Sequence, residues 1–299
     1  MKLLYCKKYS NNKFFMKKEE KIMVKPFQQG INCVIGKDVH FGNNVRLAHN
    51  VIIEDGVQIG DDVYIDSNTI VRSGVEISAA STIGANCILG EHLKDWYQDH
   101  QMHEHPLRIG KHAIIRSHTT IYGDSTIGDY FQTGHYVDIR EHSEIGAHVS
   151  VGNYSDIQGY VKIGNYVRFH SNDRIEQYSI IDDYVWIFPG VELTNDPTPP
   201  SNDMMGVHIY SFAILCANVT VLAGREVKGD ALVGAGSVVT KTVEPYQVVV
   251  GNPARVVADI RTIRNKKTGE LAYPWRYHFN RAMPWEESDY DTWLASFEK

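Results

Sequence analysis

The sequence predicts an all-β chain that winds as a parallel β-helix, with two protruding loops and a helical, aromatic C-terminal tail. Three observations carry this prediction. Aliphatic residues recur every six positions over most of the 299 residues. This regular spacing is interrupted at two places by intervals that six does not divide. Three of the five tryptophans lie beyond the last regular run, so the tail is expected to pack against the helix.

The six-residue period is the strongest signal in the sequence. Its anchor positions form three runs, Ile35 to Leu89, Ile109 to Leu193 and Ile209 to Val239, and every anchor except Thr133 is Ile, Leu, Val or Phe. An α-helix would show a period near 3.6 residues, and an amphipathic strand a period of two. Glycine often follows the anchor, which suits a tight turn. A short strand followed by a sharp turn, repeated along the chain, explains both features.

Composition limits the possible partners. The formal net charge is −6, whereas a nucleic-acid-binding protein normally presents a basic face, so no nucleic-acid partner is expected. No apolar run approaches the roughly 20 residues that span a bilayer, so no membrane partner is expected. The first residues lack a signal-peptide pattern, and a cytoplasmic location is therefore predicted.

The interruptions of the repeat define the expected organisation. We predict an N-terminal extension or cap over 1–30, a β-helix over 31–257 and a C-terminal tail over 258–299. The loops are predicted at 90–108 and 194–208, and a short helix near 258–265. Long loops on a rigid scaffold often carry binding residues.

From residue 31 to 257 the sequence resembles the hexapeptide-repeat acyltransferases. Their repeat is an aliphatic residue, glycine, two variable residues, a small residue and one variable residue, and the ending GNPARVV is similar to their closing signature. The resemblance implies a left-handed β-helix in which three hexads make one coil, and therefore about ten coils here. It also implies a homotrimer.

Four segments narrow the resemblance: GHYVDIRE, VRFHSN, VWIFPGVELTNDPTPPS and GNPARVV. Together they look like the N-acyltransferases that modify nucleotide-linked amino-deoxysugars, late in the synthesis of sugars for lipopolysaccharide or surface-layer glycans. The resemblance implies acetyl-coenzyme A as co-substrate, a nucleotide-linked amino sugar as acceptor, and an active site between adjacent subunits. It also implies that a histidine base is not universal, because some relatives let the substrate amine lose its proton without one.

His135 is the predicted catalytic residue. It lies two residues after Thr133, the exceptional anchor, and local rules tend to fail at functional sites. A step of 18 residues places it in one column with Ser117, Asn153 and Ser171. A histidine there could accept a proton near neutral pH, and the alternative is a solvent-facing residue at a variable repeat position. No serine or cysteine stands in a nucleophile-elbow context, so direct transfer is expected.

The remaining candidates divide into substrate and cofactor groups. The predicted substrate-binding residues are Asn153, His170, Asn195 and Asp196. The last two could instead serve ordinary turn chemistry in the DPTPP loop. Small residues that let pantetheine approach the backbone, and basic residues that could meet its phosphates, make up the predicted cofactor-binding set: Ala217, Ala223, Ala235, Gly236, Arg255, Arg261 and Lys266.

Three other functions remain open. The chain could acetylate a sugar hydroxyl rather than an amine, or serve as a non-catalytic β-helix subunit. It could also be a zinc enzyme resembling the β-helical carbonic anhydrases, with histidines from its first loop or repeats. His112 and His118 are six residues apart, as are His142 and His148, so the members of each pair should lie on different faces. No metal is therefore expected.

Overall fold

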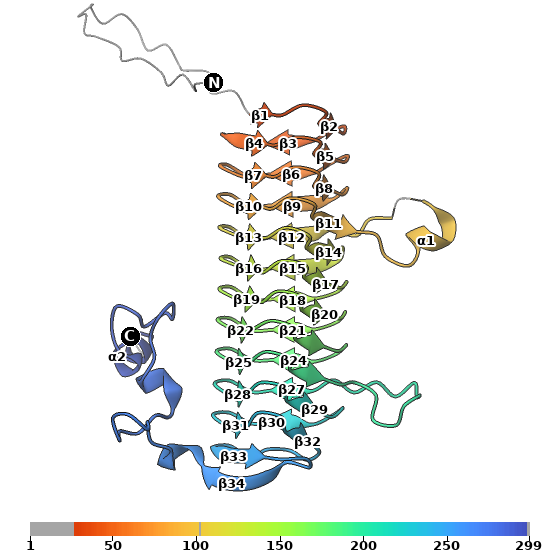
Figure 1. The fold of residues 1–299 in the computed structure, drawn as a ribbon. Helices are drawn as coiled ribbons and strands as arrows, with labels where there is room; N and C mark the ends of the chain where they lie inside the picture. The colour runs from red at the N-terminus through yellow and green to blue at the C-terminus, as the bar shows by residue number, and fades with distance from the viewer. Residues whose placement is uncertain (1–26, 102, 298–299) are drawn as a thin grey trace, which may run out of the picture.

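A computed structural model of the chain describes residues 27–101 and 103–297. They form a three-sided parallel β-helix in which each side is one long sheet of short strands (Figure 1). The predicted all-β, left-handed β-helix fold is thereby confirmed. Most of the predicted N-terminal extension lies outside the described residues.

We call the three sheets A, B and C, in the order in which the chain visits them. Sheet A contains β1 (Phe27–Gln29), β4 (Val45–Leu47), β7 (Tyr64–Ile65), β10 (Thr82–Ile83), β13 (Ile114–Ile115), β16 (Gln132–Thr133), β19 (Ser150–Val151), β22 (Arg168–Phe169), β25 (Trp186–Ile187), β28 (Ile214–Leu215), β31 (Leu232–Val233), β33 (Gln247–Val250) and β34 (Arg255–Asp259). Sheet B contains β2 (Val34–Ile35), β5 (Ile52–Ile53), β8 (Ile70–Val71), β11 (Ile88–Glu91), β14 (Thr120–Tyr122), β17 (Asp138–Ile139), β20 (Asp156–Ile157), β23 (Arg174–Ile175), β26 (Glu192–Leu193), β29 (Thr220–Val221) and β32 (Val238–Val239). Sheet C contains β3 (His40–Phe41), β6 (Gln58–Ile59), β9 (Val75–Ile77), β12 (Leu107–Ile109), β15 (Ser125–Ile127), β18 (Glu144–Ile145), β21 (Lys162–Ile163), β24 (Ile180–Ile181), β27 (His208–Ile209) and β30 (Glu226–Val227).

Strand pairing follows the 18-residue step that three hexads require. In sheet B, for example, Val34 pairs with Ile52 and Ile52 with Ile70, in parallel register. The sheets contain 13, 11 and 10 strands, so the predicted number of about ten coils is too low. The reason is that β1 precedes the first anchor, and β33 and β34 follow the last one. The pair β33 and β34 is antiparallel.

Turns between the sheets form three edges. We call them the A/B, B/C and C/A edges, after the strands that each turn joins. Many turns contain one residue with positive φ, a conformation that residues other than glycine adopt infrequently. Side chains at these positions stack along an edge, as His112, Tyr130 and His148 do on the C/A edge, with ring centroids 4.6 Å apart. Each edge is therefore a column whose chemistry the sequence sets every 18 residues.

The anchors fill the interior of the β-helix. Ile53, Ile65 and Ile121 are completely buried, and Phe169 is 4% exposed. Burying one such side chain stabilises a fold by roughly 1.5–3 kcal/mol. Because every coil repeats this burial, the scaffold is rigid enough to hold side chains on its edges in fixed register.

Two loops leave the β-helix from the same edge. Loop 1 (92–106) connects β11 with β12 and contains α1 (Trp96–Asp99), and loop 2 (194–207) connects β26 with β27. Both connect sheet B with sheet C, so both extend from the B/C edge (Figure 1).

The C-terminal tail packs on the later strands of sheet A. It contains η1 (Ile260–Thr262), η2 (Trp275–Tyr277) and α2 (Tyr290–Ala295). Trp275 and Trp285 are buried in a cluster with Ile214 and Val248, and Trp275 Nε1 donates a hydrogen bond to the carbonyl of Phe212 at 3.1 Å. The helix predicted near 258–265 is reduced to η1, because β34 pairs with β33 up to residue 259. None of the helices in the described part of the chain is long and apolar enough to cross a membrane.

Candidate active site

The predicted column of polar side chains lies on the A/B edge. The ring nitrogen Nδ1 of His135 lies 2.8 Å from Ser117 Oγ, one coil away. In the other direction, the backbone N–H of His135 donates to Asn153 Oδ1 at 2.8 Å. Asn172 N donates to the carbonyl of Asn153, which continues the column to the turn that contains Ser171.

His135 is exposed, and Ser117 occupies only one of its two ring nitrogens. Its Nε2 makes no hydrogen bond with any of the described residues. When Nδ1 carries the proton and donates to Ser117 Oγ, Nε2 presents its lone pair to solvent. This arrangement is the one that a general base needs, because the accepting nitrogen is free and the ring is oriented by its other nitrogen.

The polar anchor Thr133, beside His135, makes hydrogen bonds that an aliphatic anchor could not make. Its side chain is buried, and its Oγ1 accepts the backbone N–H of Arg116 at 2.9 Å. The Thr133 carbonyl, which a regular ladder would pair with that N–H, accepts the guanidinium of Arg116 instead. The exceptional anchor thus holds the Arg116 side chain against the strand that leads to His135.

A shallow groove of about 410 Å³ follows the column. Its walls are Arg116, Gln132, Thr133, Gly134, His135, Ser150, Val151, Gly152, Asn153 and Phe169. Glycine is required at 152, because a Cβ there would lie 2.2 Å from the carbonyl oxygen of His170.

The A/B edge around His135 carries one permanent positive charge, that of Arg116. Its turns from 116 to 173, all within the described residues, carry Arg116, His118, His135 and His170 and no exposed carboxylate. Such an edge favours an anionic ligand.

His170 lies on the same edge, two coils beyond His135. Its ring stacks on Phe188 with centroids 4.7 Å apart, and burial lowers its pKa. The structure therefore brings His170 near the Asn153 end of the column, where the side chain is neutral at pH 7.

Asn195 and Asp196 do not join this column within one chain. They begin loop 2 on the B/C edge, whereas His135 lies on the A/B edge. The Asp196 carboxylate accepts the hydroxyl and N–H of Ser201 and the N–H of Thr198, and these hydrogen bonds lower its pKa. Its contacts are those of turn chemistry.

Small residues continue the A/B edge beyond the column. Ala217, Ala235 and Gly236 occupy edge turns in the later coils, together with Gly190. Gly236 has a φ of +69°, and a Cβ built on it would meet nothing within 4 Å. The tyrosines that cover the edge at 136 and 154 thus give way to a row of small residues, interrupted by Asn218, which we call the shelf. Ala223 lies elsewhere, buried on the B/C edge.

The three predicted phosphate-binding residues are scattered. The turn before Arg255 lies against β32 through the Ala254 N–H, which donates to the Val238 carbonyl at 2.8 Å, so Arg255 lies at the end of the A/B edge. Arg261 is paired with Asp259 at 2.6 Å and lies over the ring of Tyr246, on the C/A edge. Lys266 is exposed in the tail.

Asp173 was not among the predicted site residues. Its side chain is buried beneath the A/B edge. Its Oδ1 accepts the Val191 N–H at 2.9 Å, while its Oδ2 has no hydrogen-bond partner among the described atoms. Burial raises its pKa to about 8. Its position, where other coils place Val, Thr, Ser or Cys, is the sequence signal that could have identified it.

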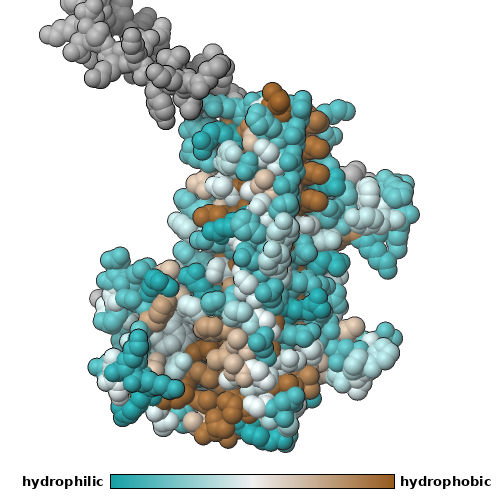
Figure 2. Space-filling model, in the orientation of Figure 1, coloured by the Kyte–Doolittle hydropathy of each residue, from teal (hydrophilic) through white to brown (hydrophobic). Residues whose placement is uncertain are grey.

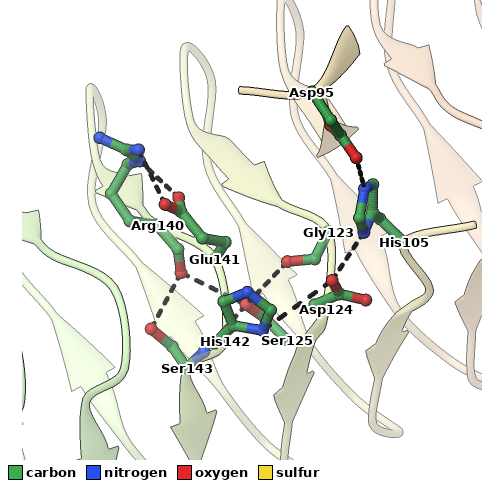
Figure 3. A network of polar contacts seen from close by, with 9 residues as sticks. All are labelled: Asp95, His105, Gly123, Asp124, Ser125, Arg140, Glu141, His142 and Ser143. Carbon is green, nitrogen blue, oxygen red and sulfur yellow. Dashed lines mark hydrogen bonds and ion pairs between the residues drawn. The ribbon is translucent and has the colours of Figure 1, made fainter. Parts of the chain in front are cut away.

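His105 of loop 1 belongs to a different network, on the B/C edge (Figure 3). His105 lies between two carboxylates, with Nε2 2.6 Å from Asp95 and Nδ1 2.6 Å from Asp124. His103 is paired with Asp99 at 2.9 Å. In residues 27–101 and 103–297, no three His, Cys, Asp or Glu side chains are grouped as if to hold a metal ion.

A zinc site like the one considered above would need histidines of the repeat to lie close together, but they lie on different edges. His112 and His148 are on the C/A edge, His118 is on the A/B edge, and His142 is on the B/C edge. The members of each pair six residues apart are thus on different edges, as their spacing predicted.

The fold is a parallel β-helix built on six-residue repeats, with a polar column along one edge. Residues 32–65 match the family model described as "Bacterial transferase hexapeptide (six repeats)". The predicted resemblance to hexapeptide-repeat transferases is confirmed by this match.

Similar proteins are acetyltransferases. The galactoside O-acetyltransferase of Escherichia coli (strain K12) is 32% identical over 95 residues, which cover 29% of this chain and 47% of the relative. The 2,3,4,5-tetrahydropyridine-2,6-dicarboxylate N-acetyltransferase of Ligilactobacillus salivarius (strain UCC118) is 40% identical over 70 residues, 23% of this chain and 29% of the relative. The chain spans about a quarter to a half of the length of the curated relatives it matches.

Among solved structures, the LpxA protein of Acinetobacter baumannii covers 77% of this chain and 74% of its own, with 18% identity and a TM-score of 0.38.

Proposed function

We propose that the protein is an acetyl-coenzyme-A-dependent N-acetyltransferase that acts on a nucleotide-linked amino-deoxysugar by direct transfer. The observation that carries the proposal is the A/B edge itself. A histidine with one oriented and one free nitrogen lies in line with a shelf of small residues, and the groove beside the histidine is lined by Arg116 and by no carboxylate.

Each part of the edge suits one part of the reaction. The sugar amine attacks the thioester carbonyl, His135 Nε2 accepts the amine proton, and the coenzyme A thiolate leaves as the amide forms. The narrow shelf at Ala217, Ala235 and Gly236 would accept the pantetheine arm along the backbone. Arg255, at the end of the same edge, would meet the phosphates of the cofactor. The proposal includes no metal, and a homotrimer of about 100 kDa, three times 33.9 kDa.

The test is acetyl-coenzyme A consumption with a panel of nucleotide-linked amino sugars and their hydroxyl analogues. We expect turnover with an amino sugar, unchanged by chelators. Ala235→Trp should raise the KM for acetyl-coenzyme A at least about tenfold by filling the shelf. Ala79→Trp, on the C/A edge, is the matched control and should leave the KM unchanged. Loss of activity in a chelator, restored by zinc, would contradict the proposal.

The E. coli relative named above is an O-acetyltransferase, which makes a hydroxyl acceptor the second candidate. Turnover of the hydroxyl analogues alone would favour it. The predicted cytoplasmic location remains a prediction.

A further inference from the structure

The outward-facing side chains of sheet A change character where the C-terminal tail stops. Trp186 and Ile214, which pair in register, pack in the apolar cluster that the tail covers. Arg168, Ser150 and Gln132 continue the same row beyond the tail. Figure 1 shows the tail reaching about the height of β22, and in Figure 2 hydrophobic side chains gather over the lower part of this face, beside the tail. Arg168 thus lies at the boundary between a covered apolar surface and an open polar one.

A notch of about 260 Å³ lies at this boundary. Sheet A contributes Gln132, Ser150 and Arg168 to its walls, the C/A edge contributes His148, and the tail contributes Ala282. Gln132 and Ser150 also line the groove of the candidate active site, so the two cavities adjoin on the surface of sheet A. A pocket that encloses a whole small-molecule ligand usually measures roughly 300–1,000 Å³. The notch therefore suits one group of a ligand.

Arg168 is the one partly buried arginine in residues 27–101 and 103–297 that has no carboxylate partner. The other three each pair with a carboxylate: Arg72, Arg140 and Arg276. The Arg168 guanidinium donates to the carbonyl of Ala282 at 3.1 Å and to Ser150 Oγ at 3.5 Å. These contacts use two of its five N–H donors. A partly desolvated cation with free donors favours an anion beside it.

The charges around the notch support the same conclusion. Burial lowers the pKa of Arg168, and the nearby Arg281 of the tail lowers it further. An anion between two such cations would relieve their repulsion. Burial, and then Arg168, also lower the pKa of His148, so its ring is neutral at pH 7. The one carboxylate among the described residues that line the notch is that of Glu286, which accepts the backbone N–H of Ala282 at 2.8 Å.

These groups match a phosphate better than a carboxylate. A guanidinium binds two phosphate oxygens with parallel N–H groups. The Ser150 hydroxyl and the Gln132 amide can donate to the remaining oxygens. A phosphate dianion would also balance the charges of Arg168 and Arg281, whereas a carboxylate carries one charge and two oxygens.

We propose that Arg168 and Arg281, at the margin of the tail, form a binding site for a phosphate group together with Ser150 and Gln132. Two sources have this chemistry. One is a phosphate of the nucleotide-linked acceptor, whose sugar would then lie in the adjoining groove beside His135. The other is free phosphate or a phosphate monoester that holds the tail against sheet A. The first source rests on the proposed function, but the site itself does not.

Titration calorimetry with inorganic phosphate and with uridine diphosphate tests the site without any activity. Arg168→Gln should weaken the binding of the probe at least about tenfold, because it removes the charge and the paired donors. Arg46→Gln is the matched control, since Arg46 is exposed in the same row of sheet A but lies on β4, far from the notch. It should bind the probe as the wild type does.

A second variant guards against an effect on folding, because Arg168 also contacts the tail backbone. Arg281 is exposed, so Arg281→Gln should keep the wild-type Tm and weaken binding a few-fold. A wild type that binds neither probe at millimolar concentration would overturn the proposal. Unchanged affinity in either variant, or an equal loss in Arg46→Gln, would overturn it too.

Kinetics and thermal unfolding distinguish the two sources. If the phosphate belongs to the acceptor, Arg168→Gln should raise the KM for the nucleotide-linked sugar at least about tenfold and leave the KM for acetyl-coenzyme A unchanged. If the site takes free phosphate, both KM values should stay unchanged. Phosphate should then raise the Tm of the wild type but not that of Arg168→Gln. A wild type that acetylates no amino sugar would contradict the proposed function, and calorimetry would still decide the phosphate site.

Discussion

The A/B and B/C edges are built from the same repeat, but only the B/C edge carries the two inserted loops. The A/B edge has no insertion along its length, and its variation is confined to side chains that change from Ser, His and Asn to Ala and Gly. The B/C edge is interrupted twice, and its side chains hold the inserted loops. A rigid solenoid thus separates a column of fixed groups from loops that can differ without disturbing that column.

Because of this difference, substitutions on the two edges should affect different properties of the protein. Substitutions on the A/B edge should change chemistry or core stability, since its residues are tied to the sheet ladder. Substitutions that free a loop on the B/C edge should change local order, because the loop contributes few core contacts.

The largest expected effect is that of His135→Asn. If His135 removes the amine proton, kcat should fall by roughly 10² to 10⁴, the usual contribution of general-base catalysis. The KM for acetyl-coenzyme A should change little, because the ring acts in the transition state. The wild-type rate should fall on the acidic side, where a protonated imidazole cannot accept a proton, and the variant should lose this limb. Steady-state kinetics across pH provide the measurement.

Two other outcomes would change the role of His135. A variant that retains more than about a third of kcat, with an unmoved pH profile, would exclude the base role and favour deprotonation by the substrate itself. A rise in the sugar KM alone would show that His135 binds the acceptor without proton transfer.

Asp173→Asn should change the pH dependence of global stability. Burial raises the pKa of Asp173 to about 8, far above the unfolded value near 3.9, so the native state holds a proton that the unfolded state loses between these values. The wild type should therefore lose stability as pH rises from about 4 to 8. Asparagine can accept the same Val191 N–H without ionising, so the variant should lose less stability over this range, by several degrees in Tm at pH 8. Equal pH slopes in thermal unfolding of the two proteins would contradict this prediction.

The sequence predicted the fold because one physical requirement repeats in every coil. An aliphatic side chain every six residues is visible without any structure, and it located the β-helix and both loops. It missed β1 and β33, which lack the hexad anchor but still pair with the ladder. The helix expected after residue 258 was wrong in extent, because backbone pairing with β33 takes precedence over local propensity up to residue 259.

The site was only partly predictable. The 18-residue step placed His135 beside Ser117 and Asn153 correctly, since sheet register follows from the repeat. Ten hexads separate the anchors Thr133 and Leu193, and ten is not a multiple of three, so the repeat itself places Asn195 on another edge than His135. The sequence could not show that Arg116 replaces a ladder hydrogen bond at Thr133, because this depends on the direction of a side chain in space.

The smallest expected effect is local and belongs to the B/C edge. Burial lowers the pKa of His105, but its hydrogen bonds with Asp95 and Asp124 outweigh burial, so the pKa lies above its ordinary value. Both ring nitrogens can donate only when the imidazole is charged. The stabilisation of loop 1 should thus be complete below the ordinary histidine pKa and be lost as pH rises through the raised value. Limited proteolysis within loop 1 should accelerate a few-fold over that rise. In His105→Gln, cleavage should be fast at every pH while Tm changes little, because the loop lies outside the core. Slow, pH-independent cleavage of loop 1 in the wild type would mean that other contacts hold it, and His105 would then have no part in the difference between the two edges.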